Sequence, residues 1–242
     1  MMKSVYVMWQ DMAYTRMWHP VAKLTQQSDE CYLFKYTKGA NHKSFTCFPN
    51  MEDKCKEYKS ETLFTFFKNR LIPESRPEHD SLFEWAGLSP DCKDYIQLLA
   101  ISGGEKKTDH FRIVNIPQNK DGYYKTKFFV SGVSHLSEDE KVNVEDLKDG
   151  DRLAFEFESR NMFDINATLL FKEINKKVGY LPHYLCNDLK SLSALSQNND
   201  IKISILKVNH SAPAQYRILC ELEAPWNKEF QPFDDDEFKE FY

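Results

Sequence analysis

The residues best suited to hold a ligand lie in the run Asn161-Met162-Phe163-Asp164-Ile165-Asn166, where an aromatic ring stands beside a carboxylate. An aromatic face can stack on a planar group such as a nucleobase, and a carboxylate accepts a hydrogen bond from a hydroxyl group. The amides of Asn161 and Asn166 can support both contacts. The same residue types often shape a turn by bonding their own backbone, so a purely structural role for Asn161, Asp164 and Asn166 stays open.

The elements around this run would position it on a small sheet. Residues 168–171 are predicted to form a strand, and residues 177–180 a second strand after a short turn. Pro182 then leads a helix from His183 to Leu195, in which leucines recur at core spacing.

Short motifs upstream complete an ordered set. Ser131-Gly132-Val133, Gly150-Asp151-Arg152-Leu153, the run at 161–167 and Val178-Gly179-Tyr180-Leu181-Pro182 follow one another as in the HIRAN domain, which residues 123–210 resemble. That family is a small β-barrel module known for capturing the 3′ ends of DNA. The resemblance implies that Phe163 stacks on the terminal base and that Asp164 accepts a hydrogen bond from the 3′-hydroxyl, with Asn161 and Asn166 as polar supports.

The chain departs from the HIRAN pattern at cationic and polar positions. Ser134 and His135 stand where the family has a basic residue followed by an aromatic one. His183 stands at a position where the family has lysine, and Tyr180 replaces a ring that is commonly polar. We therefore expect weaker attraction for phosphate, with His135 contributing when protonated, although a lone histidine at a strand end is more often a surface residue.

Lysines flank the second strand of the motif. Lys177, with Lys172 and Lys176, could follow a nucleic-acid backbone or could simply form a solvated turn.

Composition narrows the class of protein. With 242 residues, 41% of them hydrophobic, the chain can build one large or two ordinary cores. No run approaches the roughly 18 apolar residues of a membrane span, and the N-terminus lacks the form of a secretory signal, so we expect a cytoplasmic protein without membrane contact. A net charge of −5 requires any nucleic-acid contact to be local.

Metal and cofactor sites find no support in the sequence. The six cysteines form no CxxC pair and no zinc-ligand spacing, so we expect free thiols and neither a metal nor a cofactor.

The N-terminal half alternates short strands and helices. We expect a strand at Val5–Trp9, a hairpin of residues 20–25 and 31–36, and a short strand from Phe45 to Phe48. A first helix is predicted to start at an N-cap, Ser60, and to carry apolar residues from Leu63 to Leu71. A second helix is predicted at residues 81–86, ended by Gly87, and a third at residues 95–101, ended by Gly103. A strand is predicted at residues 111–114.

This order, with the segment Leu63 to Pro73, resembles the N-terminal subdomain of HipA-type toxin kinases over residues 5–116. In that family the subdomain also exists as a separate protein that binds and restrains the kinase. Here no Gly-rich phosphate loop with a following strand lysine and no catalytic His-x-Asp loop occur, and no nucleophile motif of a hydrolase is present. We expect no enzymatic activity.

The sequence thus predicts an α+β, mainly β chain of two small domains. Residues 1–117 would form a HipA-like interaction domain and 123–225 a HIRAN-like β-barrel. Residues 226–242, with two lysines and six acidic residues, would form a mobile acidic aromatic tail, either a solubiliser or a segment that docks or competes for the DNA groove.

The expected function is non-enzymatic capture of single-stranded DNA 3′ ends, coupled to a partner protein such as a kinase, helicase or nuclease in DNA repair or defence. The alternative is a protein-interaction or antitoxin-like regulator that does not bind DNA.

Overall fold

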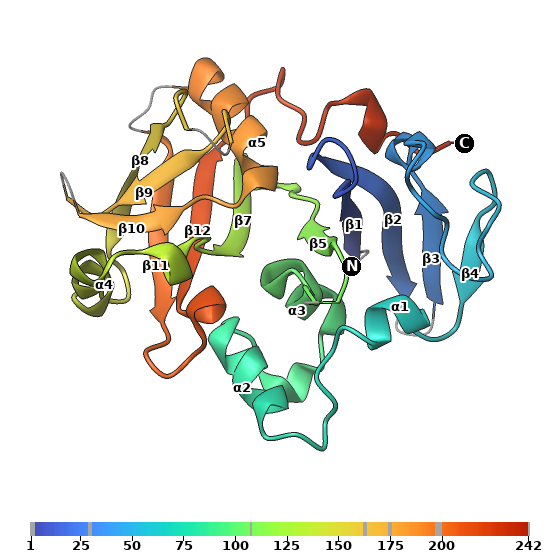
Figure 1. The fold of residues 1–242 in the computed structure, drawn as a ribbon, viewed down its shortest axis with the longest axis horizontal. Coiled ribbons are helices and arrows are strands. Elements are labelled where there is room, and N and C mark those ends of the chain that lie inside the picture. Colours follow the sequence, from blue (N-terminus) through green and yellow to red (C-terminus); the bar gives the residue numbers. More distant parts are fainter. Residues whose placement is uncertain are drawn as a thin grey trace. The chain divides into compact units, whose positions relative to one another are not determined.

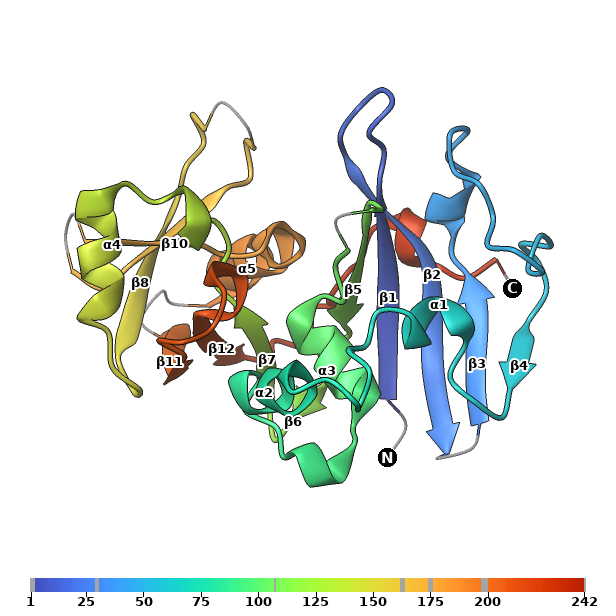
Figure 2. The same cartoon turned by 60° about the horizontal axis from the view of Figure 1, so that its bottom comes forward.

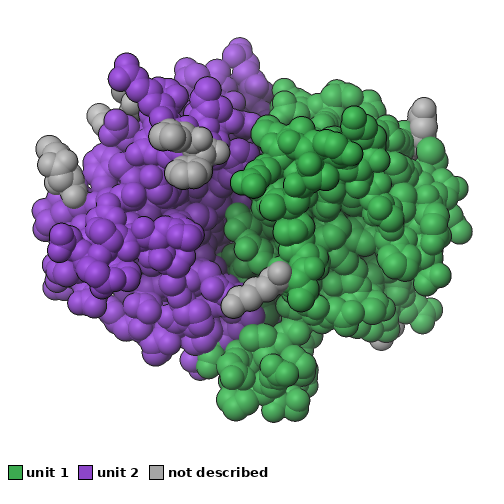
Figure 3. Space-filling model, in the orientation of Figure 1, with its two compact units in different colours: residues 1–81, 90–116, 233–242 green, residues 82–89, 117–232 purple. Residues whose placement is uncertain are grey.

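The computed structural model of the chain describes residues 3–28, 31–106, 108–161, 164–173, 176–196 and 200–241 (Figures 1 and 2). They form two compact units, coloured separately in Figure 3. Unit 1 comprises residues 1–81, 90–116 and 233–242, and unit 2 comprises residues 82–89 and 117–232. Each unit has its own sheet and its own hydrophobic core, which confirms the predicted α+β, mainly β class.

The sheet of unit 1 has five antiparallel strands in the order β4-β3-β2-β1-β5. Their bounds are β1 Lys3–Gln10, β2 Trp18–Ser28, β3 Cys31–Tyr36, β4 Tyr58–Ser60 and β5 Phe111–Asn115. The predicted hairpin of residues 20–25 and 31–36 is confirmed as the β2–β3 pair. Alternation along β1 buries Val5 and Val7 in the core and leaves Tyr6 half-buried, as a two-faced strand requires.

Helices of unit 1 begin and end where local chemistry allows. The helical segments are η1 Lys38–Asn41, α1 Thr65–Lys68, η2 Pro90–Cys92, α3 Tyr95–Ser102 and the start of α2 Glu78–Trp85, of which residues 82–85 belong to unit 2. Helix α3 starts at Asp94, whose carboxylate accepts a hydrogen bond from Gln97 N at 3.1 Å, and stops at Gly103 with φ 80°.

Two predictions in this unit are wrong. Ser60 ends β4 and exchanges hydrogen bonds with Thr62 backbone atoms, so it caps no helix, and only residues 65–68 of the expected helix are helical. Phe45 and Phe48 belong to no strand. Their rings are buried in the core from an irregular segment, and the hydroxyl of Tyr36 accepts a hydrogen bond from Phe48 N at 2.8 Å in place of a strand partner.

The sheet of unit 2 has seven strands in the order β10-β9-β8-β11-β12-β7-β6, and it curls into a half-barrel. Their bounds are β6 Asn119–Lys120, β7 Tyr123–Phe129, β8 Arg152–Phe157, β9 Thr168–Phe171, β10 Lys177–Tyr180, β11 Lys202–Val208 and β12 Ile218–Pro225. The strands predicted at residues 168–171 and 177–180 are confirmed as β9 and β10. Helical segments are η3 Val133–His135, α4 Glu138–Glu145, α5 His183–Leu195 and η5 Ala214–Tyr216.

An isolated β-bridge joins strand β10 to the segment that follows β7. Ser131, just past β7, exchanges hydrogen bonds with Tyr180 of β10, at 2.9 and 2.8 Å. Gly179 has φ 148°, and a Cβ there would lie 2.6 Å from Ser131 O and from a methyl group of Val130. The closure therefore requires glycine at position 179.

Helix α5 packs into the core of unit 2. Leu185, Leu189 and Leu192 are buried in the core of unit 2, at the spacing that the sequence predicted. None of the helices in the described ranges combines the length and apolar content that crossing a membrane requires.

The C-terminal segment is ordered against unit 1, contrary to the prediction of a mobile tail. Phe233 is buried, residues 236–238 form the short helix η6 (Asp236–Phe238), and Glu240 pairs with Thr37 as an isolated β-bridge. Two of its acidic residues, Asp236 and Glu240, form ion pairs with lysines of unit 1, and composition alone does not indicate such pairing.

Candidate functional site

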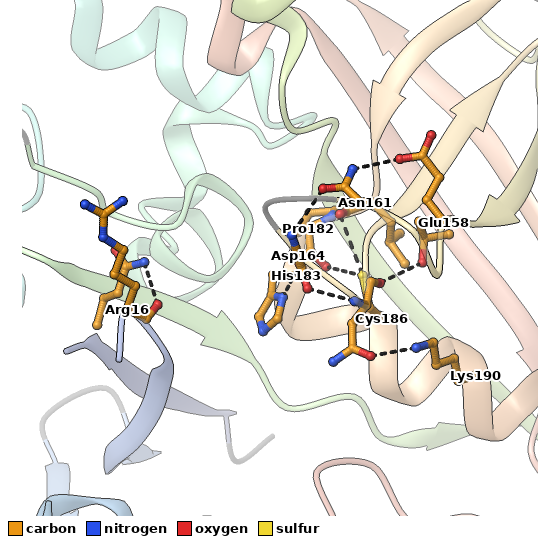
Figure 4. A network of polar contacts seen from close by, with 12 residues as sticks. Arg16, Glu158, Asn161, Asp164, Pro182, His183, Cys186 and Lys190 are labelled. Carbon is orange, nitrogen blue, oxygen red and sulfur yellow. Dashed lines mark hydrogen bonds and ion pairs between the residues drawn. The ribbon is translucent and has the colours of Figure 1, made fainter. Parts of the chain in front are cut away.

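The loop between β8 and β9 is shaped by its own polar side chains (Figure 4). Asn161 Nδ2 donates to Glu158 Oε2 at 2.8 Å, and Asn161 Oδ1 accepts from Asp164 N at 3.1 Å. Asp164 Oδ1 in turn accepts from Asn166 N at 2.8 Å. The turn-forming role that the sequence left open is thus present, and it holds Asp164 in a defined orientation.

Helix α5 fastens this loop from the other side. His183 Nδ1 lies 2.6 Å from Asp164 Oδ2, and Lys190 Nζ donates to Asn166 Oδ1 at 2.6 Å (Figure 4). His183 and Lys190 are seven residues apart and therefore lie on one helical face, turned toward the loop. Four of the predicted site residues, Asn161, Asp164, Asn166 and His183, are in this way joined in one network.

The Asp164–His183 pair is accessible to a ligand, with the two side chains 30% and 34% exposed. An ionised carboxylate offers about four acceptor positions, so Asp164 can accept a further donor such as a hydroxyl beside Asn166 N and His183. His183 occupies the first turn of a 13-residue helix, where backbone N–H groups and the helix dipole favour an anion. The pair thus presents an acceptor beside a donor.

A nucleophile is missing from the described part of this network. Cys186 lies one turn along α5 from His183, but it is buried, and burial raises the pKa of its thiol to about 11. A thiol of that kind stays protonated at neutral pH and is a poor nucleophile. Among the described residues, no group of three His, Cys, Asp or Glu side chains is arranged to hold a metal ion.

The remaining predicted site residues lie outside the network. Tyr180 pairs through its backbone with Ser131, and Lys177 Nζ lies 4.9 Å from the centre of its ring. Lys177 also faces Glu140 at 3.7 Å, so part of its charge is balanced. His135 is exposed in η3. Phe163 lies outside the described residues.

Two members of the network were missed by the sequence analysis, Glu158 and Lys190. A signal existed for Lys190, because a position seven residues after His183 faces the same way on a helix. No comparable signal marked Glu158, which becomes relevant only because the loop turns back on itself at Asn161.

The two halves of the chain match two different family models. Residues 123–227 match the HIRAN domain, and residues 14–106 match the HipA N-terminal domain. The chain thus joins a segment similar to the HipA N-terminal domain to a segment similar to the HIRAN domain. Both resemblances indicated by the sequence motifs are confirmed. The HIRAN match spans the β8–β9 loop, the closing contact at Gly179 and helix α5, and a HIRAN domain suggests DNA binding. No curated protein and no solved structure shows significant similarity to the chain.

Proposed function

We propose that this chain captures the 3′ end of single-stranded DNA without catalysing a reaction, and that its HipA N-terminal domain docks the protein that acts on the captured end. The observation that carries the first part is the Asp164–His183 pair, held within the HIRAN domain by the loop on one side and α5 on the other. The sequence resemblance assigns hydroxyl recognition to Asp164, and the structure gives that carboxylate a fixed orientation.

The chemistry of a DNA end fits this arrangement. A terminal 3′-hydroxyl can donate to the partly exposed carboxylate of Asp164, while the adjacent phosphate can accept from His183 or from the first backbone amides of α5. A 3′-phosphate would place negative charge against the carboxylate. The site would therefore distinguish a free hydroxyl from a phosphorylated end.

The absence of catalysis is part of the proposal. It is supported by the buried, high-pKa thiol of Cys186 and by the lack of a kinase phosphate loop in the sequence. Nucleotide or DNA-end turnover by the pure protein that disappears in an Asp164→Asn variant would contradict it.

A second candidate is a regulator that binds protein and not DNA. One observation that favours it is that Asp164 already makes hydrogen bonds with Asn166 N and His183. Another is that Ser134 and His135 stand where the HIRAN pattern has a basic and an aromatic residue. In that case the network would serve only to hold the loop.

Fluorescence anisotropy with short single strands tests the end-binding function. Wild-type protein should prefer a 3′-hydroxyl end over a 3′-phosphate end and over a circular strand of equal length. Asp164→Asn, which keeps the shape and removes the charge, should lose the preference between hydroxyl and phosphate. Asp200→Asn is the matched control, since Asp200 is exposed in the same unit. Equal binding of ends and circles, or no binding at micromolar protein, would favour the second candidate.

A further inference from the structure

Two lysines face each other on the sheet of unit 1. Tyr6, Lys23 and Lys35 are cross-strand neighbours on β1, β2 and β3, because Tyr6 is paired with Lys23 and Lys23 with Lys35. Val5 and Val7 point to the buried core, so by alternation this row lies on the opposite face. Like charges directly opposite each other destabilise a sheet, and the row therefore needs an anion.

The chain supplies that anion from its own C-terminus. Glu240 accepts from Lys23 Nζ at 2.8 Å and lies 3.0 Å from Lys35 Nζ. Burial works against its ionisation, but the hydrogen bonds from the two lysines outweigh burial and lower the pKa of Glu240. Backbone pairing accompanies the charge contact, since Lys38 N donates to Lys239 O at 2.9 Å and Glu240 bridges to Thr37.

Aromatic rings and outer ion pairs extend the same contact. Phe233 and Phe238 stack at 4.8 Å between ring centres, and Tyr6 meets them edge-on at 5.5 and 4.9 Å. Asp236 pairs with Lys38 at 3.1 Å, and Glu237 approaches His19 Nδ1 at 3.0 Å. We call residues 233–241 the strap, and the strap surface consists of Tyr6, His19, Lys23, Lys35 and Lys38.

The strap contacts combine the features by which a domain recognises a short linear segment. Aromatic anchors, main-chain pairing and complementary charge act together over one stretch of chain. The strap lies outside both family matches, which end at residues 106 and 227, so neither matched domain accounts for its contact with the strap surface. Its outermost acidic groups, Asp236 and Glu237, are about half or more exposed, and such ion pairs contribute little individually.

We propose that the strap surface is a docking site for an extended acidic–aromatic segment of a partner protein, and that the strap occupies it as an internal competitor. This inference rests on the proposed function in so far as the partner docks through the HipA N-terminal domain. The partner segment places one carboxylate between Lys23 and Lys35 and an aromatic ring against Tyr6. Binding displaces the strap, so the apparent affinity is reduced by the fraction of chains with the surface closed.

A labelled peptide of residues 231–241 probes the surface in trans. Full-length protein with Phe238→Ala and Glu240→Gln, which weaken the strap, should bind this peptide at least about tenfold more tightly than wild type. Adding Lys23→Glu and Lys35→Glu should abolish that binding. Lys93→Glu, which reverses an exposed lysine elsewhere in unit 1, is the matched charge control and should leave the affinity unchanged.

A measurement on the wild-type chain needs no variant. Saturating peptide should speed amide hydrogen exchange in residues 233–241, whereas a scrambled peptide of equal charge should not. Equal peptide affinity for wild type and the strap variant, or binding that survives Lys23→Glu and Lys35→Glu, would overturn the proposal. A concentration-dependent dimer of the strap variant would assign the surface to a second copy of the chain, and would overturn it equally.

The result is separable from DNA binding. If the peptide fails to bind while the 3′-end preference persists, the docking inference falls and the end-capture function stands. The strap variants alter no residue of the Asp164–His183 network.

Discussion

Asp164 accepts hydrogen bonds from Asn166 N and from His183, and these two partners fix different properties of the site. The bond from Asn166 is local and belongs to the turn. The contact with His183 joins positions 19 residues apart and depends on helix α5 lying across the loop. Residue types at 161–166 were enough to predict a polar turn with a carboxylate, but no spacing rule could predict the long-range pair.

The pairing of His183 with Asp164 leads to a prediction on charge. His183→Lys keeps a donor for Asp164 and provides an ammonium group that stays charged near neutral pH. At pH 8 the variant should bind a single-stranded 3′ end roughly 3–10-fold more tightly, the effect of neutralising about one more phosphate. Fluorescence anisotropy at pH 8 measures the difference.

His210→Lys is the control, because His210 is exposed in the same unit and lies outside the network. If both variants strengthen binding equally, the gain reflects net charge and not the position of His183. If His183→Lys leaves binding unchanged at pH 8, phosphate does not approach this end of α5.

At the scale of elements, the spacing of apolar residues predicted strands and helices better than the types of residue present did. Strands β9 and β10 follow from their strand-like residue pattern, and helix α5 follows from its leucine spacing. The segments 45–48 and 63–71 did not, because aromatic rings there are buried in the core without regular backbone pairing. Large rings in close contact, such as Phe48 and Phe66 at 4.6 Å, stabilise an irregular chain path that mimics a strand or helix pattern in the sequence.

The closure of the half-barrel gives a prediction on stability. Gly179→Ala places a methyl group too close to Ser131 O and Val130, and alanine is also disfavoured at the positive φ of this position. The substitution should therefore reduce the free energy of unfolding by about 3 kcal/mol. Gly150→Ala is the control, since Gly150 also has positive φ but nothing within 4 Å of the added carbon. It should cost only about 1 kcal/mol.

Urea unfolding followed by circular dichroism compares the two glycine variants. DNA-end binding should weaken in Gly179→Ala as well, because β10 leads directly into the first turn of α5. Equal destabilisation by both substitutions would mean that the Ser131–Tyr180 contact tolerates a wider separation than the structure has.

At the scale of the whole molecule, the units do not follow the order of the sequence. Residues 82–89 belong to unit 2, where Trp85 stacks on Tyr216 at 6.0 Å and its carbonyl accepts from Asn209 Nδ2 at 3.0 Å. The strap likewise belongs to unit 1. A sequence scan assigns neighbouring residues to one domain, so neither exchange was predicted. Fragments cut near residue 117 would remove a packed segment from each unit.

The strap provides the last prediction, a response of unit 1 to acid. Because the pKa of Glu240 in the folded chain is lowered from its ordinary value of 4.5, its carboxylate stabilises the closed strap fully above about pH 4.5. That contribution is lost as the pH falls through the lowered value, when protonation removes the charge between Lys23 and Lys35.

Glu240→Gln should weaken the closed strap by about 1 kcal/mol near neutral pH, which corresponds to a roughly fivefold faster amide exchange in residues 233–241. Exchange measured between pH 3 and 7, and corrected for the intrinsic rate, should show the two proteins converging in acid. Added salt should narrow the gap at pH 7, since the lysine row is partly exposed to solvent. A constant difference between wild type and Glu240→Gln across this range would show that the amide contacts and the aromatic rings, and not the charge on Glu240, hold the strap closed.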